Sequence, residues 1–326
     1  MKICLTSYDA PDIPQWVFDR LSEHGCSLAC SPVEHAEGLP QAVIDADAVW
    51  VYGGGREITG EVVRELKNCR LILRSGTGTD NVAVETATER GILVANTPEA
   101  STDTVAEHAI ALMLDVLRRV TELDREVRAG RWNRDSGKYP VHTLTGRTLG
   151  LLGFGRIARA VAKKLSGFDM KILVHDPGVD DEQISKLGCE PVSLQALFES
   201  SDVLSLHCPL LSDSHHIVGA CELALMKPTA VLVNTARGKL IDEKAFIAAL
   251  QEGKIAGAGL DVLEQQPPED DNPLIAMDNV VINPHMAGYD EGLRYRFWEQ
   301  SVRTLIATQE SGRPIWIVNP EVLESA

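Results

Sequence analysis

The chain has 326 residues and a formal net charge of −16, with 44% hydrophobic and 24% charged residues. This composition is typical of a globular protein with two domains, and its acidity argues against nucleic acid or an anionic membrane as a partner. No apolar run is long enough to span a membrane, and residues 1–6 predict a first strand and not a signal peptide. Seven scattered cysteines without a Cys-x-x-Cys pair, and histidines without ligand spacing, predict a reduced, cytoplasmic protein with no metal site.

The first hundred residues alternate between strand-like and helical segments. Strands are predicted at 2–6, 48–52, 71–74 and 92–95, and helices at 16–24, 61–66 and 84–90. Glycine-rich turns fall at residues 53–55 and 76–78. From Ser101 a helical pattern runs toward Arg128 with apolar residues on more than one face, which predicts burial between domains or between subunits. Residues 131–145 form an arm with little pattern.

A glycine-rich turn in the middle of the chain predicts a dinucleotide site. An apolar run at 148–152 leads into Gly153 and Gly155, then Ala158 opens a helical segment, and a second strand ends at Asp176. The two glycines permit a tight turn and a close approach of the pyrophosphate, which the helix N-terminus attracts. The acid accepts hydrogen bonds from a ribose and repels a 2′-phosphate, so NAD is favoured over NADP. Glycine turns also begin ordinary helices; the order strand, turn, helix, strand and acid makes this one specific.

The remaining pattern predicts a discontinuous α/β protein. Further strands are expected near residues 203, 230, 257 and 280, and a last helix at 292–308 precedes an extended tail. We predict two Rossmann-like, doubly wound parallel-sheet domains with a ligand cleft between them. The flavodoxin-like substrate (catalytic) domain comprises residues 1–99 and 289–326, and the inserted NAD-binding domain comprises residues 100–288.

Three chemically useful residues follow predicted strands of the nucleotide domain. Arg237 follows the strand that begins at 230, Asp261 follows the next, and His285 follows the last. Carboxyl ends of parallel strands meet at one edge of a sheet, so these side chains can converge. An arginine that holds a carboxylate, and a histidine that exchanges a proton with an alkoxide, suit hydride transfer to a 2-oxo acid. Taken singly, the arginine could form a salt bridge at a helix start, and the histidine could be a turn residue.

Ordered motifs along nearly the whole chain identify a resemblance. The chain resembles the D-isomer-specific 2-hydroxyacid dehydrogenases at residues 74–82, 104–108, 153–157, 207–210, 234–238, 259–262 and 284–288. Among them it is most similar to phosphoglycerate dehydrogenases and to hydroxypyruvate and glyoxylate reductases. The resemblance implies an NAD-dependent oxidoreductase acting on a small 2-hydroxy or 2-oxo acid. It also implies a homodimer, assembled through the helix after Ser101 and the arm at 131–145.

The resemblance also implies roles for individual residues. Arg237 and His285 match the catalytic positions, Arg237 as the substrate-binding residue and His285 as the proton donor. The turn Ser75, Gly76 and Gly78 matches the loop whose N–H groups bind the substrate carboxylate. The positions that match cofactor contacts are Thr77, Gly153, Gly155, Arg156, Ile157, Asp176, Cys208, Thr235, Ala236, Asp261 and Gly288.

One departure from the family concerns the partner of the histidine. Gln266 stands where the family has a glutamate, so we assign it to the catalytic group as an amide that orients His285 without adding charge. Glu264 is interpreted as a solvated loop acid. Formate dehydrogenases of the superfamily carry glutamine beside this histidine, which makes such an activity the alternative. Against it, this chain lacks their N-terminal extension, and Ser101 replaces an asparagine.

A second departure concerns phosphate recognition. Phosphoglycerate dehydrogenases have an arginine at the start of the loop that here reads Gly53-Gly54-Gly55, and only Arg56 is close. An unphosphorylated acid such as hydroxypyruvate or glyoxylate is therefore as well supported as a phosphorylated one. A further alternative is a dinucleotide-sensing, corepressor-like protein with little turnover, which the missing glutamate favours and the retained Arg237 and His285 oppose.

Overall fold

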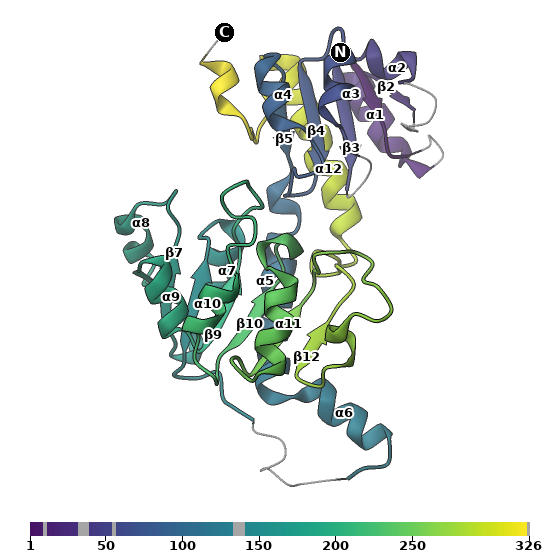
Figure 1. Ribbon diagram of the computed structural model, residues 1–326. Coiled ribbons are helices and arrows are strands. Elements are labelled where there is room, and N and C mark those ends of the chain that lie inside the picture. The colour runs from purple at the N-terminus through teal and green to yellow at the C-terminus, as the bar shows by residue number, and fades with distance from the viewer. Residues whose placement is uncertain (9–11, 32–38, 54–56, 133–140, 325–326) are drawn as a thin grey trace. The chain divides into compact units, whose positions relative to one another are not determined.

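The computed structural model describes residues 1–8, 12–31, 39–53, 57–132 and 141–324, in two compact units (Figure 1). Unit 1 comprises Met1–Ser101 and Asp290–Ala326, and unit 2 comprises Thr102–Tyr289. Arg56, which the sequence offers as a phosphate ligand, lies outside the described residues.

Unit 1 is built on a five-stranded parallel sheet with the order β2-β1-β3-β4-β5. This is the flavodoxin-like doubly wound order, as predicted. The strands are β1 (Lys2–Leu5), β2 (Ser27–Cys30), β3 (Ala48–Tyr52), β4 (Leu71–Ser75) and β5 (Leu93–Asn96). The helices are α1 (Gln15–Glu23), α2 (Gln41–Ile44), α3 (Gly60–Glu65), α4 (Val84–Glu89), η2 (Pro98–Ala100), α12 (Leu293–Ser311) and η6 (Pro320–Leu323).

Both faces of this sheet are covered, which explains why every residue of β3 is buried. Successive side chains of the strand point to opposite faces, so Trp50 joins the core that includes α1 and α12, while Val49 and Val51 join the core that includes α3. Trp50 packs edge-on against Trp298 of α12, with ring centroids 5.2 Å apart. The C-terminal segment is therefore part of the core of unit 1.

Unit 2 is built on a seven-stranded parallel sheet with the order β12-β11-β10-β9-β6-β7-β8. The order reverses between β6 and β9, which is the Rossmann pattern with one added strand. The strands are β6 (Thr148–Leu152), β7 (Lys171–His175), β8 (Glu190–Pro191), β9 (Val203–Leu206), β10 (Val231–Asn234), β11 (Gly257–Leu260) and β12 (Val280–Ile282). The helical elements are α5 (Thr102–Arg118), α6 (Val120–Arg128), α7 (Arg156–Lys164), η3 (Ser166–Phe168), α8 (Asp181–Lys186), α9 (Leu194–Ser200), α10 (Ala220–Leu225), η4 (Gly238–Leu240), α11 (Glu243–Gln251) and η5 (Pro273–Ala276).

The helical stretch expected from Ser101 toward Arg128 is confirmed, and the structure divides it into two helices. Arg119 adopts a left-handed backbone conformation, with φ 52°, and this ends α5 and starts α6 in a new direction. The apolar residues of α5, among them Ala109 and Met113, are buried in the core of unit 2 beside Leu149. Burial within this unit therefore accounts for their excess over one stripe, and the predicted burial between domains or subunits stays a prediction.

Two strands were absent from the sequence prediction. Ser27–Cys30 and Glu190–Pro191 are the edge strands β2 and β8, and both are short and partly exposed. Edge strands lack the continuous apolar run that identifies buried parallel strands. The doubly wound parallel-sheet fold predicted for both units is nevertheless confirmed.

Candidate active site

The turn between β6 and α7 has the geometry that a dinucleotide requires. Gly153 has a φ of +90°, and a Cβ atom there would lie 2.6 Å from the backbone nitrogen of Cys208, so no side chain fits. Gly155 is the N-cap of α7, where no side chain caps the helix, and a Cβ atom there would meet open space. The open space over Gly155 and the uncapped N–H groups of α7 fit a pyrophosphate. Arg156 is exposed and Ile157 half-buried at the same helix start.

Asp176 is fixed at the end of β7 by two backbone groups. Its carboxylate accepts hydrogen bonds from the N–H groups of Phe154, at 2.7 Å, and Gly178, at 2.8 Å. A hollow of about 770 Å³, partly open to solvent, lies beside it and is also lined by His175, Pro177 and Val192. A carboxylate held at this place can accept hydrogen bonds from ribose hydroxyls and repels a 2′-phosphate.

Two residues after β9 line the other side of the glycine turn. Burial raises the pKa of the Cys208 thiol to about 11. Burial also lowers the pKa of His207 to about 4, and its ring is hydrogen bonded to the Ser205 hydroxyl at 2.9 Å. Both groups are therefore uncharged at neutral pH. The side chains of His207 and Cys208, whose backbone Gly153 approaches, therefore place no charge beside the pyrophosphate site.

Asn234 shapes the turn that follows β10 and presents Arg237. The fully buried Asn234 side chain accepts from the N–H of Ala236 and donates to the carbonyl of Arg237. Arg237 donates from Nη1 to the carbonyl of Ala236 at 2.7 Å. The buried Thr235 hydroxyl has no hydrogen-bond partner among the described residues, which suits a position that contacts a cofactor.

His285 is held in an unusual backbone conformation by Asp261. Its φ is 56°, and its N–H donates to the carbonyl of Asp261 at 2.8 Å. The Asp261 carboxylate, which is 1% exposed, accepts from the N–H groups of Met286 and Ala287 at 2.7 and 2.8 Å. Asp261 therefore anchors the turn that carries His285, and its predicted contact with the cofactor stays a prediction. Gly288, at the end of this turn, is half-buried.

His108, on α5, contacts residues at the start of this turn, and the sequence did not indicate that role. Nε2 of His108, on α5, is 3.0 Å from Oδ1 of Asn283 and 3.6 Å from Oδ1 of Asp261. Because a carbonyl oxygen only accepts, the hydrogen-bond network assigns the proton to Nε2 of His108. Its only sequence signal is its place in the motif at 104–108.

Gln266 and His285 are in contact, as the family resemblance implied. Oε1 of Gln266 is 2.8 Å from Nδ1 of His285, and Nε2 of Gln266 donates to the carbonyl of Leu263 at 3.0 Å. The bond to Leu263 fixes which end of the amide faces the ring, so Nδ1 of His285 carries the proton. The other ring nitrogen, Nε2, is then the atom that can exchange a proton with a substrate.

Glu264 is more than the solvated acid that we expected. Its carboxylate contacts Nε2 of His216 at 3.0 Å and accepts from the N–H of Glu243 at 3.2 Å. Its own N–H donates to the Glu243 carboxylate at 3.0 Å. These partners lie at least 21 residues away in the chain, so no local pattern could indicate them.

In unit 1, some of the polar groups in the predicted substrate loop already form hydrogen bonds within the protein. The Ser75 side chain is fully buried and accepts from Trp50 at 2.8 Å, while the N–H of Gly76 donates to Thr97 at 2.6 Å. Across the residues with assigned positions, the N–H groups of Thr77 and Gly78 donate no hydrogen bond. They are therefore the donors of this loop that a carboxylate can use.

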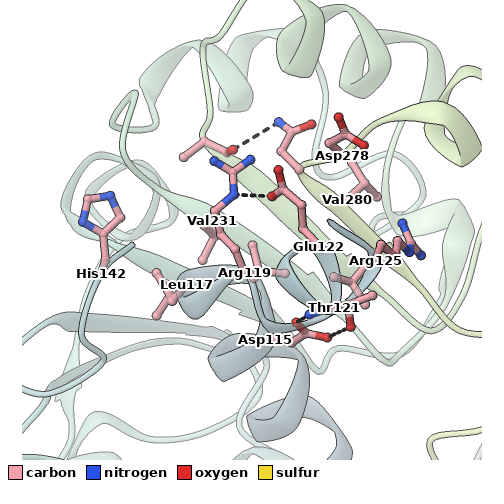
Figure 2. A pocket seen from close by; sticks show the side chains of 14 residues that line it. Asp115, Leu117, Arg119, Thr121, Glu122, Arg125, His142, Val231, Asp278 and Val280 are labelled. Atoms are coloured by element: carbon pink, nitrogen blue, oxygen red, sulfur yellow. Dashed lines mark hydrogen bonds and ion pairs between the residues drawn. The ribbon is translucent and has the colours of Figure 1, made fainter. Parts of the chain in front are cut away.

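A second hollow lies at the amino ends of the strands of unit 2 (Figure 2). It is lined by the first residues of β10 and β12, Val231 and Val280, and by the junction of α5 and α6. Figure 2 shows Arg119 paired with Glu122 and Thr121 bonded to Asp115 at this junction. None of the predicted catalytic or cofactor residues lines it, so it is separate from the candidate site.

No group of three histidine, cysteine or acidic residues among the described positions could hold a metal ion. None of the helices described is long and apolar enough to cross a membrane.

The sequence and the fold match known proteins. The profile of the D-isomer specific 2-hydroxyacid dehydrogenase NAD binding domain matches residues 110–287. A glyoxylate reductase from Korarchaeum cryptofilum is 44% identical over 82% of this chain and 81% of its own length. A D-3-phosphoglycerate dehydrogenase from Archaeoglobus fulgidus is 37% identical over 85% of this chain, which spans only 52% of that relative.

A solved glyoxylate reductase structure from Paecilomyes thermophila superimposes with a TM-score of 0.88 at 31% identity, covering 98% of each chain. The dinucleotide turn fits NAD, and the matched region is the NAD-binding domain of its family. The chain therefore belongs to the D-isomer-specific 2-hydroxyacid dehydrogenases and is an NAD-dependent oxidoreductase of 2-hydroxy acids.

Proposed function

We propose that the chain reduces a small, unphosphorylated 2-oxo acid of the glyoxylate or hydroxypyruvate kind to the D-2-hydroxy acid. The observation that carries the proposal is the His285–Gln266 hydrogen bond, which engages Nδ1 and so assigns proton exchange to Nε2, at the carboxyl end of the sheet where Arg237 also emerges. Similarity to glyoxylate reductases supports the substrate class. The cofactor, when bound at the β6–α7 turn, would supply the hydride as NADH or accept it as NAD⁺.

Arg237 is the proposed holder of the substrate carboxylate. Its guanidinium follows β10, and it can bind two oxygens of one carboxylate and polarise the neighbouring carbonyl. In unit 1, the N–H groups of Thr77 and Gly78 are the proposed further donors to a substrate carboxylate.

His285 is the proposed proton carrier. In reduction, protonated His285 gives the Nε2 proton to the oxygen that becomes the hydroxyl; in oxidation, neutral His285 accepts that proton at Nε2. Gln266 holds the ring through Nδ1 but supplies no charge. The protonated ring is therefore stabilised less than it would be by a glutamate at the same place.

The test follows NADH consumption with glyoxylate, hydroxypyruvate, phosphohydroxypyruvate and pyruvate, for the wild-type chain and for Arg237→Ala. We expect turnover of an unphosphorylated acid, its loss in Arg237→Ala, and NADH binding that is nearly unchanged. Lys239→Ala is the matched control, because it removes an exposed positive charge two residues away. Full activity in Arg237→Ala, or turnover of phosphohydroxypyruvate alone, would contradict the proposal.

A second candidate activity is formate oxidation, which the uncharged His285–Gln266 pair specifically favours. Formate gives carbon dioxide without a proton transfer, so it needs no charged partner for the histidine. NAD reduction by formate, together with no turnover of any 2-oxo acid, would replace our proposal with this one. NADH binding without any turnover would instead indicate a dinucleotide sensor.

We also propose that two copies of the chain associate through α6. Figure 1 shows this helix extending away from the sheet of unit 2, and none of its residues is buried. Val120 and Val127, two turns apart on one face, are 58% and 49% exposed, and nearby Trp132 is 80% exposed. A nine-residue helix is marginal without packing, so a second copy is the proposed cover. Sedimentation should give a dimer that Val127→Asp weakens; a wild-type monomer would contradict this.

We propose the cytoplasm as the location. The seven cysteines are thiols that form no disulfide, including the exposed Cys221, which suits a reducing compartment. Recovery of the native protein from a secreted fraction would overturn this assignment.

A further inference from the structure

Glu264 lies at the centre of a cluster that joins three separate segments of unit 2. One oxygen of its carboxylate accepts a hydrogen bond from Nε2–H of His216, and the other accepts one from the N–H of Glu243. Glu243 reciprocates by accepting the N–H of Glu264 at 3.0 Å and is itself held by Asn272 at 2.7 Å. Both carboxylates thus accept hydrogen bonds from donors that belong to other segments. The side chains of His216 and Glu264 are 35% and 32% exposed, so water only partly competes for these bonds.

The cluster fixes the segment that presents Gln266. Leu263 and Glu264 precede Gln266 by three and two residues, and the carbonyl of Leu263 is the group that orients the Gln266 amide. If Glu264 lost its partners, the carbonyl that orients the amide would lose its fixed position. The amide would then no longer present Oε1 to the ring of His285.

The same segment also touches the turn that carries Arg237. A Cβ atom on Gly238 would overlap the carbonyl group of Leu263, so the two backbones are in direct contact and only glycine fits. The N–H of His216 donates to the carbonyl of Lys239 at 2.9 Å, which ties the cluster to this turn from the other side. The segments behind Arg237 and behind Gln266 are therefore clamped together by one set of contacts.

We propose that Glu264 is a positioning residue for the reaction, acting through Gln266 on His285. This inference rests on the proposed function, since it assumes that the orientation of His285 limits turnover. Glu264 need not touch substrate or cofactor. Its removal should lower kcat because the histidine ring loses its fixed orientation, while the dinucleotide turn at Gly153 and Gly155 is untouched.

The experiment compares Glu264→Ala, Glu264→Gln and the control Gln265→Ala, an exposed neighbour on the same loop. We expect kcat of Glu264→Ala to fall about tenfold or more, as for other residues that orient a catalytic group. The dissociation constant of NADH should stay unchanged. Glu264→Gln should keep most of kcat, because its oxygen can accept from Glu243 while its NH₂ group donates to the other tautomer of His216. Gln265→Ala should match the wild type.

A double-mutant cycle separates positioning from general structural support. If Glu264 acts through Gln266, Glu264→Ala should lower kcat much less in a Gln266→Ala background than in the wild type. Equal losses in both backgrounds, or equal kcat in Glu264→Ala and Gln265→Ala, would overturn the inference. Should Glu264→Ala fail to fold, His216→Asn replaces it, because asparagine tolerates the left-handed φ of 54° but is too short to reach Glu264. A wild-type chain without 2-oxo acid turnover would instead refute the proposed function.

Discussion

Replacing Gln266 by glutamate should shift the pH dependence of the reaction in a defined direction. The amide oxygen lies 2.8 Å from Nδ1 of His285, so a carboxylate of the same length would place a negative charge beside the ring. That charge stabilises the imidazolium and raises the pKa of His285 relative to the wild type. Reduction needs protonated His285 and fades as the pH rises through this pKa. The falling limb should therefore move to higher pH in Gln266→Glu.

The size of the shift follows from the distance and the exposure. Two charges about 4 Å apart interact by about 1 kcal/mol in water and by about 4 kcal/mol at a protein-like effective dielectric constant. The side chains of Gln266 and His285 are both exposed, which favours the water-like value. One pH unit corresponds to about 1.4 kcal/mol, so we expect a shift of about one pH unit.

The assay is kcat/KM for 2-oxo acid reduction across the pH range, at constant ionic strength because salt screens exposed charges. Gln265→Glu is the control, since it adds the same charge to the exposed neighbour of Gln266. In the oxidative direction the rising limb should move the same way, because neutral His285 is then the active form. Superimposable profiles for wild type and Gln266→Glu would refute this role for Gln266.

Three further outcomes follow from the structure. Gly155→Val should abolish NADH binding without lowering the melting temperature, because its side chain would fill only the space over the turn. Gly153→Val should also destabilise unit 2, because its side chain would overlap the backbone near Cys208. Retained NADH binding in Gly155→Val would contradict the assignment of this turn as the pyrophosphate site. Asp176→Ala should narrow the ratio of the NADPH to the NADH dissociation constant, and an unchanged ratio would show that the carboxylate does not discriminate. Burial alone would raise the pKa of Asp202, but Lys227 and the N–H of Thr148 outweigh it and hold this pKa below 3.8. The stability that this pair adds is present at neutral pH and disappears as the pH falls below 3.8, so Lys227→Met should destabilise the chain at pH 7 more than at pH 3 in denaturant titrations; equal losses would contradict this.

The parts of the fold that could be predicted from the sequence are those determined by residues close together in the chain. The glycine turn from Gly153 to Asp176 could be read because each requirement falls on one residue at a fixed spacing. Buried parallel strands such as β3 were readable as continuous apolar runs. The break at Arg119 was not, because it has neither proline nor glycine to mark it, and its left-handed backbone depends on surrounding contacts.

The candidate site divides in the same way. The family resemblance implied that Gln266 and His285 would meet, and they do. The bonds of Glu264 to His216 and Glu243 escaped prediction, because they join segments that are brought together only by the folded sheet. The spacing of residues along the chain indicates which of them lie at the carboxyl ends of the strands. It does not indicate which of their side chains form hydrogen bonds with each other.

The composition of the unit 1 core sets an order for folding during synthesis. This core contains Ile3 and Trp50 from the start of the chain, but also Trp298 and Val322 from its end. Unit 2 is contiguous and complete once Tyr289 has been made. All of unit 2 is therefore synthesised before unit 1 can complete its core, and the opening hundred residues lack their packing partners in the last helix until that helix leaves the ribosome.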